Sequence, residues 1–332
     1  MSAIKESTGV VINGPNDLAH STIAIGKVGD DEVIVKVHSA PVNPADLMLL
    51  QGAYPAGKSH PCTAGLEGSG VVVEAGAGAA AQALVGKRVA FFGSLPTQGT
   101  WGDFCHTSAK TCFPLLDSID FEQGACALIN PLTVEAMMIE CDEKGYKAVV
   151  HSGASSQLGR MMVKIAPKHN VTVINLVRRE ENVKMLKEAG AQIVVDTTAA
   201  DWEATLDALI AEHKPQAFFD CVCGEVGSKV LAALPPKATT YTYGALGGFS
   251  YNVGVGDLIF KDKHVRGFWL NNQIADPARG AAAATAMMTH LAAGVYKTEV
   301  AKRFKTSEFA EALEFYKGNM TAGKVLFQNA NF

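Results

Sequence analysis

The stretch KAVVHSGASSQLGRMMVKIAPKHNVTVINLVRR, residues 147–179, decides the fold class of this chain. A short apolar run is followed by a small, polar turn that contains Gly153 and Gly159. Apolar side chains then recur at helical spacing from Leu158, and residues 171–177 are typical of a buried parallel strand. This order predicts a strand–turn–helix–strand unit. The start of such a helix binds anions, so a dinucleotide pyrophosphate is a candidate ligand.

The turn matches the dinucleotide-binding fingerprint GxGxxG only in part, because Ser155 stands at its middle glycine. An ordinary strand–helix–strand piece of any parallel sheet has the same pattern. The end of the second strand is more specific, because Arg178 and Arg179 stand where a free ribose 2′-hydroxyl would need Asp or Glu. Arginine donors suit a 2′-phosphate, so the sequence favours NADP(H) over NAD(H). The alternative is a solvated loop that pairs with Glu180 and Glu181.

The composition excludes several classes of function. A length of 332 residues favours two domains, and 48% hydrophobic with 19% charged residues are typical of a globular protein. The net charge of −4 argues against a nucleic-acid partner, and no apolar run is long enough for a membrane span. The first residues show no targeting segment, so we expect a cytoplasmic location, or an organelle if a transit peptide was removed. The seven cysteines lack metal-ligand spacing and predict no disulfide framework.

The rest of the chain predicts two architectures. Residues 1–125 contain short β-type runs between Gly, Pro, Asn and Asp, and residues 126–270 alternate helices and strands as in a doubly wound parallel sheet. Residues 271–332 are expected to return to the first domain, and Pro131 to interrupt a helix at residues 122–140. Strands are expected at residues 10–12, 32–37, 70–74, 88–92, 103–107, 148–151, 171–177, 192–196, 217–221, 239–243, 265–270 and 324–328, and further helices at 181–189, 201–213, 228–234, 278–293 and 307–317.

Six motifs in register resemble those of the medium-chain dehydrogenase/reductase superfamily across essentially the whole chain. This resemblance implies an α/β protein with a mostly-β, GroES-like catalytic domain (residues 1–125 and 271–332) and a Rossmann domain (residues 126–270). It also implies a homodimer, since dimers are common in the family. The motifs are VNPADLMLLQGAYP (residues 42–55), PCTAGLEGSGVVVEAG (61–76), NPLTVEAMM (130–138), the turn quoted above, YGALGG (243–248) and GKVLF (323–327).

The chain departs from the zinc-dependent branch of that family. No cysteine stands in residues 42–46, Leu66 replaces the histidine before Glu67, and only Cys105 and Cys112 fall in the segment of the cysteine-rich zinc lobe. A catalytic zinc needs three protein ligands, so we expect no metal. The chain resembles the zinc-independent quinone oxidoreductases and 2-enoyl thioester reductases. The motifs QGAYP, GTW, NLVRR and FKDKHVRGFWL are most similar to mitochondrial-type enoyl thioester reductases.

The sequence therefore predicts an NADPH-dependent oxidoreductase that transfers hydride to the β-carbon of an α,β-unsaturated thioester or ketone. Charge that appears on the carbonyl oxygen needs fixed donors, and the α-carbon needs a proton. Tyr54 is the candidate proton donor, as the resemblance also suggests, although it could be a buried tyrosine that caps a backbone group. An NADPH:quinone oxidoreductase is the alternative, and a non-catalytic NADPH-binding protein is the alternative from another class. The expected partners are an enoyl thioester, enone or quinone and a second copy of the chain, with no nucleic acid or membrane.

Most candidate cofactor-binding residues follow predicted strands, where doubly wound folds bind ligands. Asn43 and Thr133 are candidates for the nicotinamide–ribose end, or else a turn residue and a helix-start residue. Lys324 either reaches the cofactor or is a surface charge, and Trp101 and Trp269 line an apolar slot or belong to the core. The cofactor set is Asn43, Thr133, Ser156, Gln157, Leu158, Arg178, Arg179, Tyr243, Gly244, Ala245, Leu246, Phe268, Trp269, Leu270 and Lys324.

Overall fold

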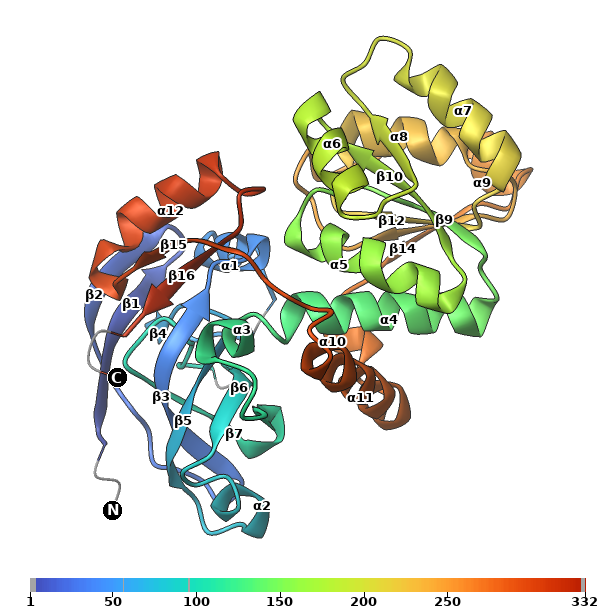
Figure 1. Ribbon diagram of the computed structural model, residues 1–332. Coiled ribbons are helices and arrows are strands. Elements are labelled where there is room, and N and C mark those ends of the chain that lie inside the picture. The colour runs from blue at the N-terminus through green and yellow to red at the C-terminus, as the bar shows by residue number, and fades with distance from the viewer. Residues whose placement is uncertain (1–3, 56, 95, 330–331) are drawn as a thin grey trace. The chain divides into compact units, whose positions relative to one another are not determined.

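The chain divides into two compact units (Figure 1). One unit is built from Met1–Ile129 and Leu291–Phe332, and the other from Asn130–His290. A mostly-β unit and a unit with a parallel sheet confirm the expected α/β class. The computed structural model describes residues 4–55, 57–94, 96–329 and 332.

The first unit contains two sheets. A three-stranded sheet has the order β2-β1-β4, and a seven-stranded sheet has the order β15-β16-β3-β5-β6-β8, with β7 also paired to β3. Among the strand pairs formed by the described residues of this unit, only β15–β16 is parallel. The strands are β1 (Glu6–Gly14), β2 (Asp17–Ala24), β3 (Glu32–Pro41), β4 (Cys62–Thr63), β5 (Glu67–Ala75), β6 (Arg88–Phe92), β7 (Phe104–Ser108), β8 (Cys112–Pro114), β15 (Val300–Phe304) and β16 (Lys324–Gln328), and the helices are α1 (Pro44–Leu50), α2 (Ala79–Gln82), η1 (Ala109–Thr111), α3 (Phe121–Ala125), η3 (Thr306–Glu308) and α12 (Phe309–Gly318).

The core of the first unit lies under these sheets and includes Trp101. Its indole is fully buried, donates from Nε1 to the Pro41 carbonyl at 3.1 Å, and packs 4.8 Å from the Phe327 ring centroid. A buried indole with a satisfied N–H is a core residue, so Trp101 does not line a slot.

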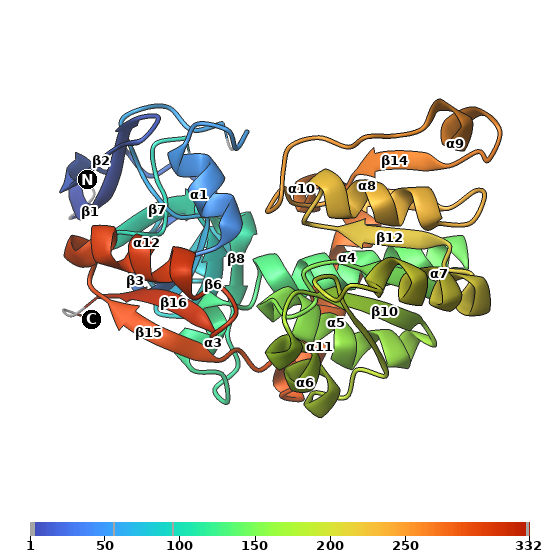
Figure 2. The same ribbon diagram turned by 90° about the horizontal axis from the view of Figure 1, so that it is seen from above.

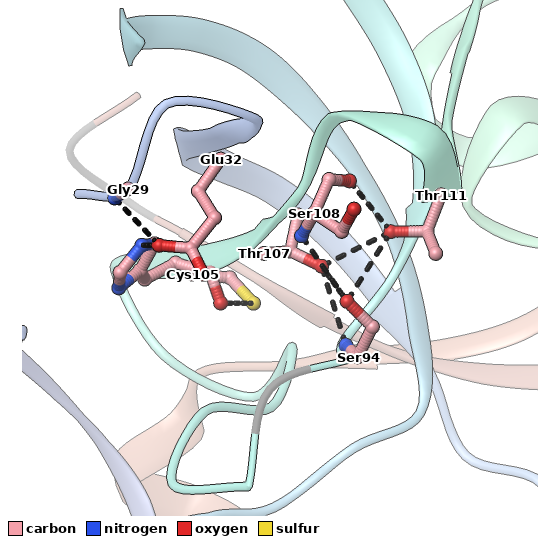
Figure 3. A network of polar contacts seen from close by, with 8 residues as sticks. Gly29, Glu32, Ser94, Cys105, Thr107, Ser108 and Thr111 are labelled. Atoms are coloured by element: carbon pink, nitrogen blue, oxygen red, sulfur yellow. Dashed lines mark hydrogen bonds and ion pairs between the residues drawn. The ribbon is translucent and has the colours of Figure 1, made fainter. Parts of the chain in front are cut away.

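A network of hydroxyl groups fixes the loop that follows β6 (Figure 3). Ser94 Oγ lies 2.7 Å from Thr107 Oγ1, which in turn donates to the Phe92 carbonyl at 2.6 Å. Thr107 Oγ1 also lies 3.1 Å from Thr111 Oγ1, and the Ser108 N–H donates back to Ser94 Oγ at 3.1 Å. The start of the loop is therefore tied to β7 by hydrogen bonds of side-chain hydroxyl groups.

The second unit is a doubly wound sheet with the order β11-β10-β9-β12-β13-β14, in which every pair is parallel. Its edge strand β14 is visible in Figure 2. The strands are β9 (Ala148–His151), β10 (Thr172–Val177), β11 (Ile193–Asp196), β12 (Ala217–Asp220), β13 (Thr239–Thr242) and β14 (His264–Gly267), and the helices are α4 (Ile129–Lys144), α5 (Gln157–Ile165), η2 (Ala166–His169), α6 (Glu180–Glu188), α7 (Trp202–His213), α8 (Gly224–Ala233), α9 (Val255–Ile259), α10 (Leu270–Gln273) and α11 (Pro277–Ala292).

Apolar residues cover both faces of this sheet, as a buried parallel sheet requires. On one face α7 and α8 pack through residues such as Leu206 and Val230 against Ile174 of β10. On the other face Val163 of α5 and Leu186 of α6 belong to a second cluster. The carboxyl ends of the strands are left for the loops that carry the candidate site.

Two expectations about helices are corrected. Pro131 lies in the first turn of α4 rather than in an interruption, because the N–H that proline lacks has no partner in a first turn anyway. Helix α11 begins in the second unit, where Arg279 donates to Glu140 at 2.8 Å and to Glu143 at 2.6 Å on α4. The second boundary between the units falls at His290 instead of Leu270.

Candidate active site

In the first unit, Tyr54 lies in the segment between α1 and β4. Its side chain is half-buried and packs against the core of this unit. The neighbouring Gln51, Gly52, Ala53 and Pro55 are exposed. The aromatic ring is thus supported by the core while its segment lies at the surface, which suits a residue that presents a hydroxyl to a small molecule.

A buried cluster of polar side chains surrounds the start of α1. The Asn43 amide donates from Nδ2 to Glu67 at 2.9 Å, and its Oδ1 accepts a hydrogen bond from the Lys324 ammonium. The three side chains are 1%, 1% and 5% exposed. Glu67 also accepts the backbone N–H groups of Leu128 at 3.2 Å and Ile129 at 2.9 Å, so it caps the start of α4. The Nδ2 and Oδ1 atoms of Asn43 and the Lys324 ammonium all form hydrogen bonds within this unit. That Asn43 and Lys324 also bind a cofactor stays a prediction.

Burial shifts the protonation of the two carboxyl groups in this cluster. It raises the pKa of Asp46 to about 7, while the N–H of Asn43, which donates to Asp46 at 2.8 Å, opposes the shift. It also raises the pKa of Glu67, against the attraction of the Lys324 ammonium and the hydrogen bonds just described. Two buried carboxyl groups therefore share one neighbouring cation.

In the second unit, the turn between β9 and α5 has the geometry of a dinucleotide cradle. Ser156 is the N-cap of α5, and its hydroxyl accepts the Gly159 N–H at 3.1 Å. Gln157 and Leu158 are the first residues of the helix, so their N–H groups lie at its positive end. Gly153 turns the chain with a φ of 61°.

Gly159 supplies the close packing that the fingerprint assigns to its third glycine. A Cβ at this position would lie 2.1 Å from the Ala154 carbonyl oxygen, so only glycine lets α5 approach the turn. Sequence reasoning missed this role because Gly159 stands one position later than the GxGxxG spacing demands. The residues present therefore fit a bound pyrophosphate.

Arg178 and Arg179 follow β10 and are both exposed. Arg179 has a φ of 76°, its N–H donates to Asp196 at 3.0 Å, and its guanidinium lies 3.3 Å from Glu181. Within the described part of the chain, no carboxylate forms an ion pair with the Arg178 guanidinium. Of the two predicted arginines, Arg178 is the one whose donors remain available for a ligand phosphate.

Asp220 organises the loops at the carboxyl ends of β12 and β13, a role that sequence reasoning missed. It is fully buried and accepts hydrogen bonds from Ser152 Oγ at 2.5 Å and Tyr251 OH at 2.7 Å. It also accepts the N–H groups of Val222 and Cys223 at 2.8 and 3.1 Å. The sequence signal for this role is an acidic residue, Asp220, directly after the apolar run AFF at residues 217–219.

The loop after β13 contains the predicted residues Tyr243, Gly244, Ala245 and Leu246. The Tyr243 hydroxyl lies 2.7 Å from His151 Nε2, and burial raises its pKa well above the ordinary value. Burial also lowers the pKa of His151 to about 3, so this histidine is neutral and structural. A Cβ on Gly244 would meet the Cys221 side chain at 2.9 Å, and the Leu246 N–H donates to the Cys221 carbonyl at 2.8 Å. This loop is thereby locked onto the end of β12.

The remaining predicted residues of the second unit differ in role. Phe268 is 2% exposed and packs 5.7 Å from the Phe219 ring, so it is a core residue. Trp269 is half-buried and precedes α10, which begins at Leu270, so the expected strand ends before them. Thr133 is buried inside α4.

Both units of the chain are similar to known protein families. A family model described as an alcohol dehydrogenase GroES-like domain matches residues 29–118, and one described as a zinc-binding dehydrogenase matches residues 158–286. The solved structure of a putative NADPH:quinone reductase from Mesorhizobium loti is 31% identical, with a TM-score of 0.89 over 99% of this chain and 100% of that chain. The chain belongs to the medium-chain dehydrogenase/reductase superfamily.

This medium-chain reductase falls in the zinc-independent branch. Among the described residues, no group of three His, Cys, Asp or Glu side chains is placed to hold a metal, and no helix is long and apolar enough to cross a membrane. A mitochondrial enoyl-[acyl-carrier-protein] reductase of Arabidopsis thaliana is 29% identical over 261 residues, which are 75% of this chain and 67% of that protein. A solved complex of the protein Etr1p with NADP and crotonyl-CoA has the same fold, with 21% identity and a TM-score of 0.78 over 98% of this chain and 100% of that one.

Proposed function

We propose that this medium-chain reductase uses NADPH to reduce the carbon–carbon double bond of an α,β-unsaturated thioester or ketone. The observation that carries the proposal is the Tyr54 side chain, which is supported by the core and lies in an exposed segment. The enoyl reductase among the relatives supports a thioester substrate. The fold can hold NADP and crotonyl-CoA together, as the Etr1p complex illustrates.

The residues of this chain then have defined tasks. NADPH supplies the hydride that adds to the β-carbon of the substrate. Tyr54 donates its phenolic proton to the α-carbon and recovers a proton from water, so the double bond gains one hydride and one proton. A tyrosine suits this task because its hydroxyl is a neutral donor at pH 7.

The substrate proposal is tested by NADPH consumption with crotonyl-CoA and with benzoquinone under matched conditions. We expect turnover of the thioester and little turnover of the quinone. Tyr54→Phe should lower kcat on crotonyl-CoA by about 100-fold, the lower range for the loss of a general acid. Tyr146→Phe, which removes a hydroxyl that contacts Tyr241 at 3.1 Å, is the matched control and should leave kcat unchanged. Full activity of Tyr54→Phe would refute its role as the donor.

An NADPH:quinone reductase is the second candidate, and the full-length similarity to the Mesorhizobium loti protein favours it. That reaction needs no dedicated proton donor on the protein, since the reduced quinone takes its proton from water. Turnover of benzoquinone alone, with no effect of Tyr54→Phe, would establish this alternative. Tight NADPH binding without turnover of either substrate would instead indicate a non-catalytic NADPH-binding protein.

We propose NADPH rather than NADH because of Arg178, which has no carboxylate partner among the described residues. A charge-assisted bond to phosphate contributes about 1.5–3 kcal/mol, and about 1.4 kcal/mol is a tenfold change in Kd. Arg178→Ala should therefore weaken NADPH binding by tenfold or more and leave NADH binding unchanged, as measured by fluorescence titration. Combining it with Arg179→Ala should add little, because Arg179 already pairs with Glu181. Equal weakening for both cofactors would mean that neither arginine binds the 2′-phosphate.

We also propose that the protein is a homodimer in which a second copy covers the free edge of the parallel sheet. All four residues of β14 are exposed, and its outer edge has no partner strand among the described residues. Large apolar side chains beside it are exposed as well, with Phe260 at 86% and Ile259 at 66%. Two copies of one edge strand pair antiparallel about a two-fold axis, which covers both edges at once.

A cytoplasmic location stays a prediction, which cell fractionation would test against a mitochondrial one.

A further inference from the structure

The N-terminal side of the segment that carries Tyr54 is fixed by the end of α1. The Gly52 N–H donates to the Leu49 carbonyl at 3.0 Å. The Ala53 N–H donates to the Met48 carbonyl at 2.9 Å. These bonds extend the ordered backbone to the residue directly before Tyr54, so the aromatic side chain departs from a defined position.

Lys58 fixes the C-terminal side of the same segment. Its ammonium donates to the carbonyl of Gly93 at 2.8 Å and to the carbonyl of Gln98. The next residue, Ser59, donates its backbone N–H to the Pro96 carbonyl at 3.0 Å. Hydrogen bonds from an ionised donor are about twice as strong as neutral ones. Burial lowers the pKa of Lys58, so the ammonium depends on these carbonyl groups in place of water.

The loop that accepts these bonds is held near both of its ends by side-chain hydrogen bonds. Its first residues are held by the hydroxyl network of Ser94, Thr107, Ser108 and Thr111 (Figure 3). Its far end is held by Gln98, whose Nε2 donates to the Ala24 carbonyl at 3.2 Å. Lys58 therefore ties the Tyr54 segment to residues that are themselves hydrogen-bonded to β7 and to the Ala24 carbonyl.

We propose that Lys58 is a positioning residue for Tyr54, because its ammonium fixes the segment on which the Tyr54 hydroxyl must meet the substrate. The inference rests on the proposed proton-donor role of Tyr54. A proton donor acts only within hydrogen-bond reach of the atom that it protonates, and a misplacement of about 1 Å costs up to about 100-fold in rate. Lys58 itself need not touch the substrate, so its loss should lower kcat without weakening cofactor binding.

A double-mutant cycle tests this role with crotonyl-CoA as the probe. Lys58→Met should lower kcat by about tenfold in the wild-type background, with the Kd for NADPH unchanged. In the Tyr54→Phe background the same substitution should change kcat less than twofold, since the hydroxyl to be positioned is already absent. Lys58→Arg keeps a cation with several donors and should retain kcat within about threefold. Lys87→Met, at an exposed lysine of the same unit, is the control and should have no effect.

The outcomes separate the two proposals. If Tyr54→Phe is impaired and Lys58→Met lowers kcat equally in both backgrounds, Lys58 acts independently of Tyr54 and the positioning role is refuted. If Tyr54→Phe is fully active, the proton-donor role fails and the positioning role fails with it. If Lys58→Met does not fold, Lys58→Gln and Lys58→Arg carry the comparison, and equal kcat for these two variants refutes the need for a cation.

Discussion

At the scale of single residues, Asp46 makes the stability of the first unit depend on pH. It is fully buried, and burial raises its pKa from 3.8 to about 7. The nearby Glu67 adds to this shift, and the Lys324 ammonium opposes it. Between about pH 4 and pH 7 the folded chain keeps a proton on Asp46 that the unfolded chain has lost. The contribution of Asp46 to the free energy of unfolding therefore falls as pH rises through this window and is constant above it.

Asp46→Asn should remove this dependence. The amide stays neutral at every pH, and its oxygen can still accept the Asn43 N–H at the start of α1. The free energy of unfolding should fall between pH 5 and pH 8 by about 2 kcal/mol less in the variant than in the wild type. Urea unfolding at both pH values measures this difference. Asp117→Asn, at an exposed position, should behave as the wild type, and an unchanged slope in Asp46→Asn would contradict the shift.

The sequence singled out Tyr54 because it stands in a motif and Arg178 because it directly follows a strand; the structure has Tyr54 half-buried and Arg178 exposed, and the roles of both stay predictions. It did not predict the contact between Asn43 and Lys324, which lie at opposite ends of the chain. No local pattern shows that two distant segments will share one buried cluster. The anchoring of Lys58 on two carbonyl groups was invisible for the same reason.

At the scale of elements, the turn into α5 requires a residue without a side chain, which is Gly159. Gly159→Ala should force the start of α5 away from the turn, because the new Cβ would lie 2.1 Å from the Ala154 carbonyl oxygen. Overpacking of this kind costs about 1–3 kcal/mol. We expect a lower Tm and at least tenfold weaker NADPH binding, measured by thermal unfolding and fluorescence titration. Gly318→Ala, where nothing lies within 4 Å of the added Cβ, should change neither, and normal NADPH affinity in Gly159→Ala would refute the cradle.

Elements were predicted well where an apolar run is bounded by turn residues. Strands β6, β9 and β16 have the expected limits. Strands β2 and β15 were missed because most of their residues are not buried, so no apolar run marks them. The strand expected at residues 265–270 is shorter, because the apolar Phe268 and Leu270 pack after the sheet has ended.

At the scale of the whole molecule, the exposed sheet edge predicts the assembly. The chain should migrate as a dimer of two 35.0 kDa copies in sedimentation experiments. Phe260→Asp together with Val265→Asp should place charges beside and on β14 and shift the mass to that of one copy. Leu116→Asp, at an exposed apolar residue of the first unit, should leave the dimer intact. A wild-type chain that sediments as a monomer would refute the proposed edge pairing.

The division into units was predicted only in outline. The change from β-type runs to alternating helices and strands marks the first boundary within a few residues of Ile129. The second boundary was misplaced because α11 is rich in alanine and its sequence does not show which unit it packs against. The structure shows that α11 packs in the second unit, because Arg279 donates to two glutamates of α4.

The pairing of β16 with β3 has a consequence for biosynthesis. Strand β16 pairs with Ser39, Ala40 and Pro41, so this end of β3 lacks that partner on the ribosome until nearly the whole chain has been made, whereas β7 can already pair with residues 32–36. At about 5–20 residues per second that interval is on the order of tens of seconds. The second unit is continuous in sequence and can complete its sheet first. We therefore expect chaperones to engage the nascent chain at this open end of β3, while Glu67 of β5 still lacks its cation.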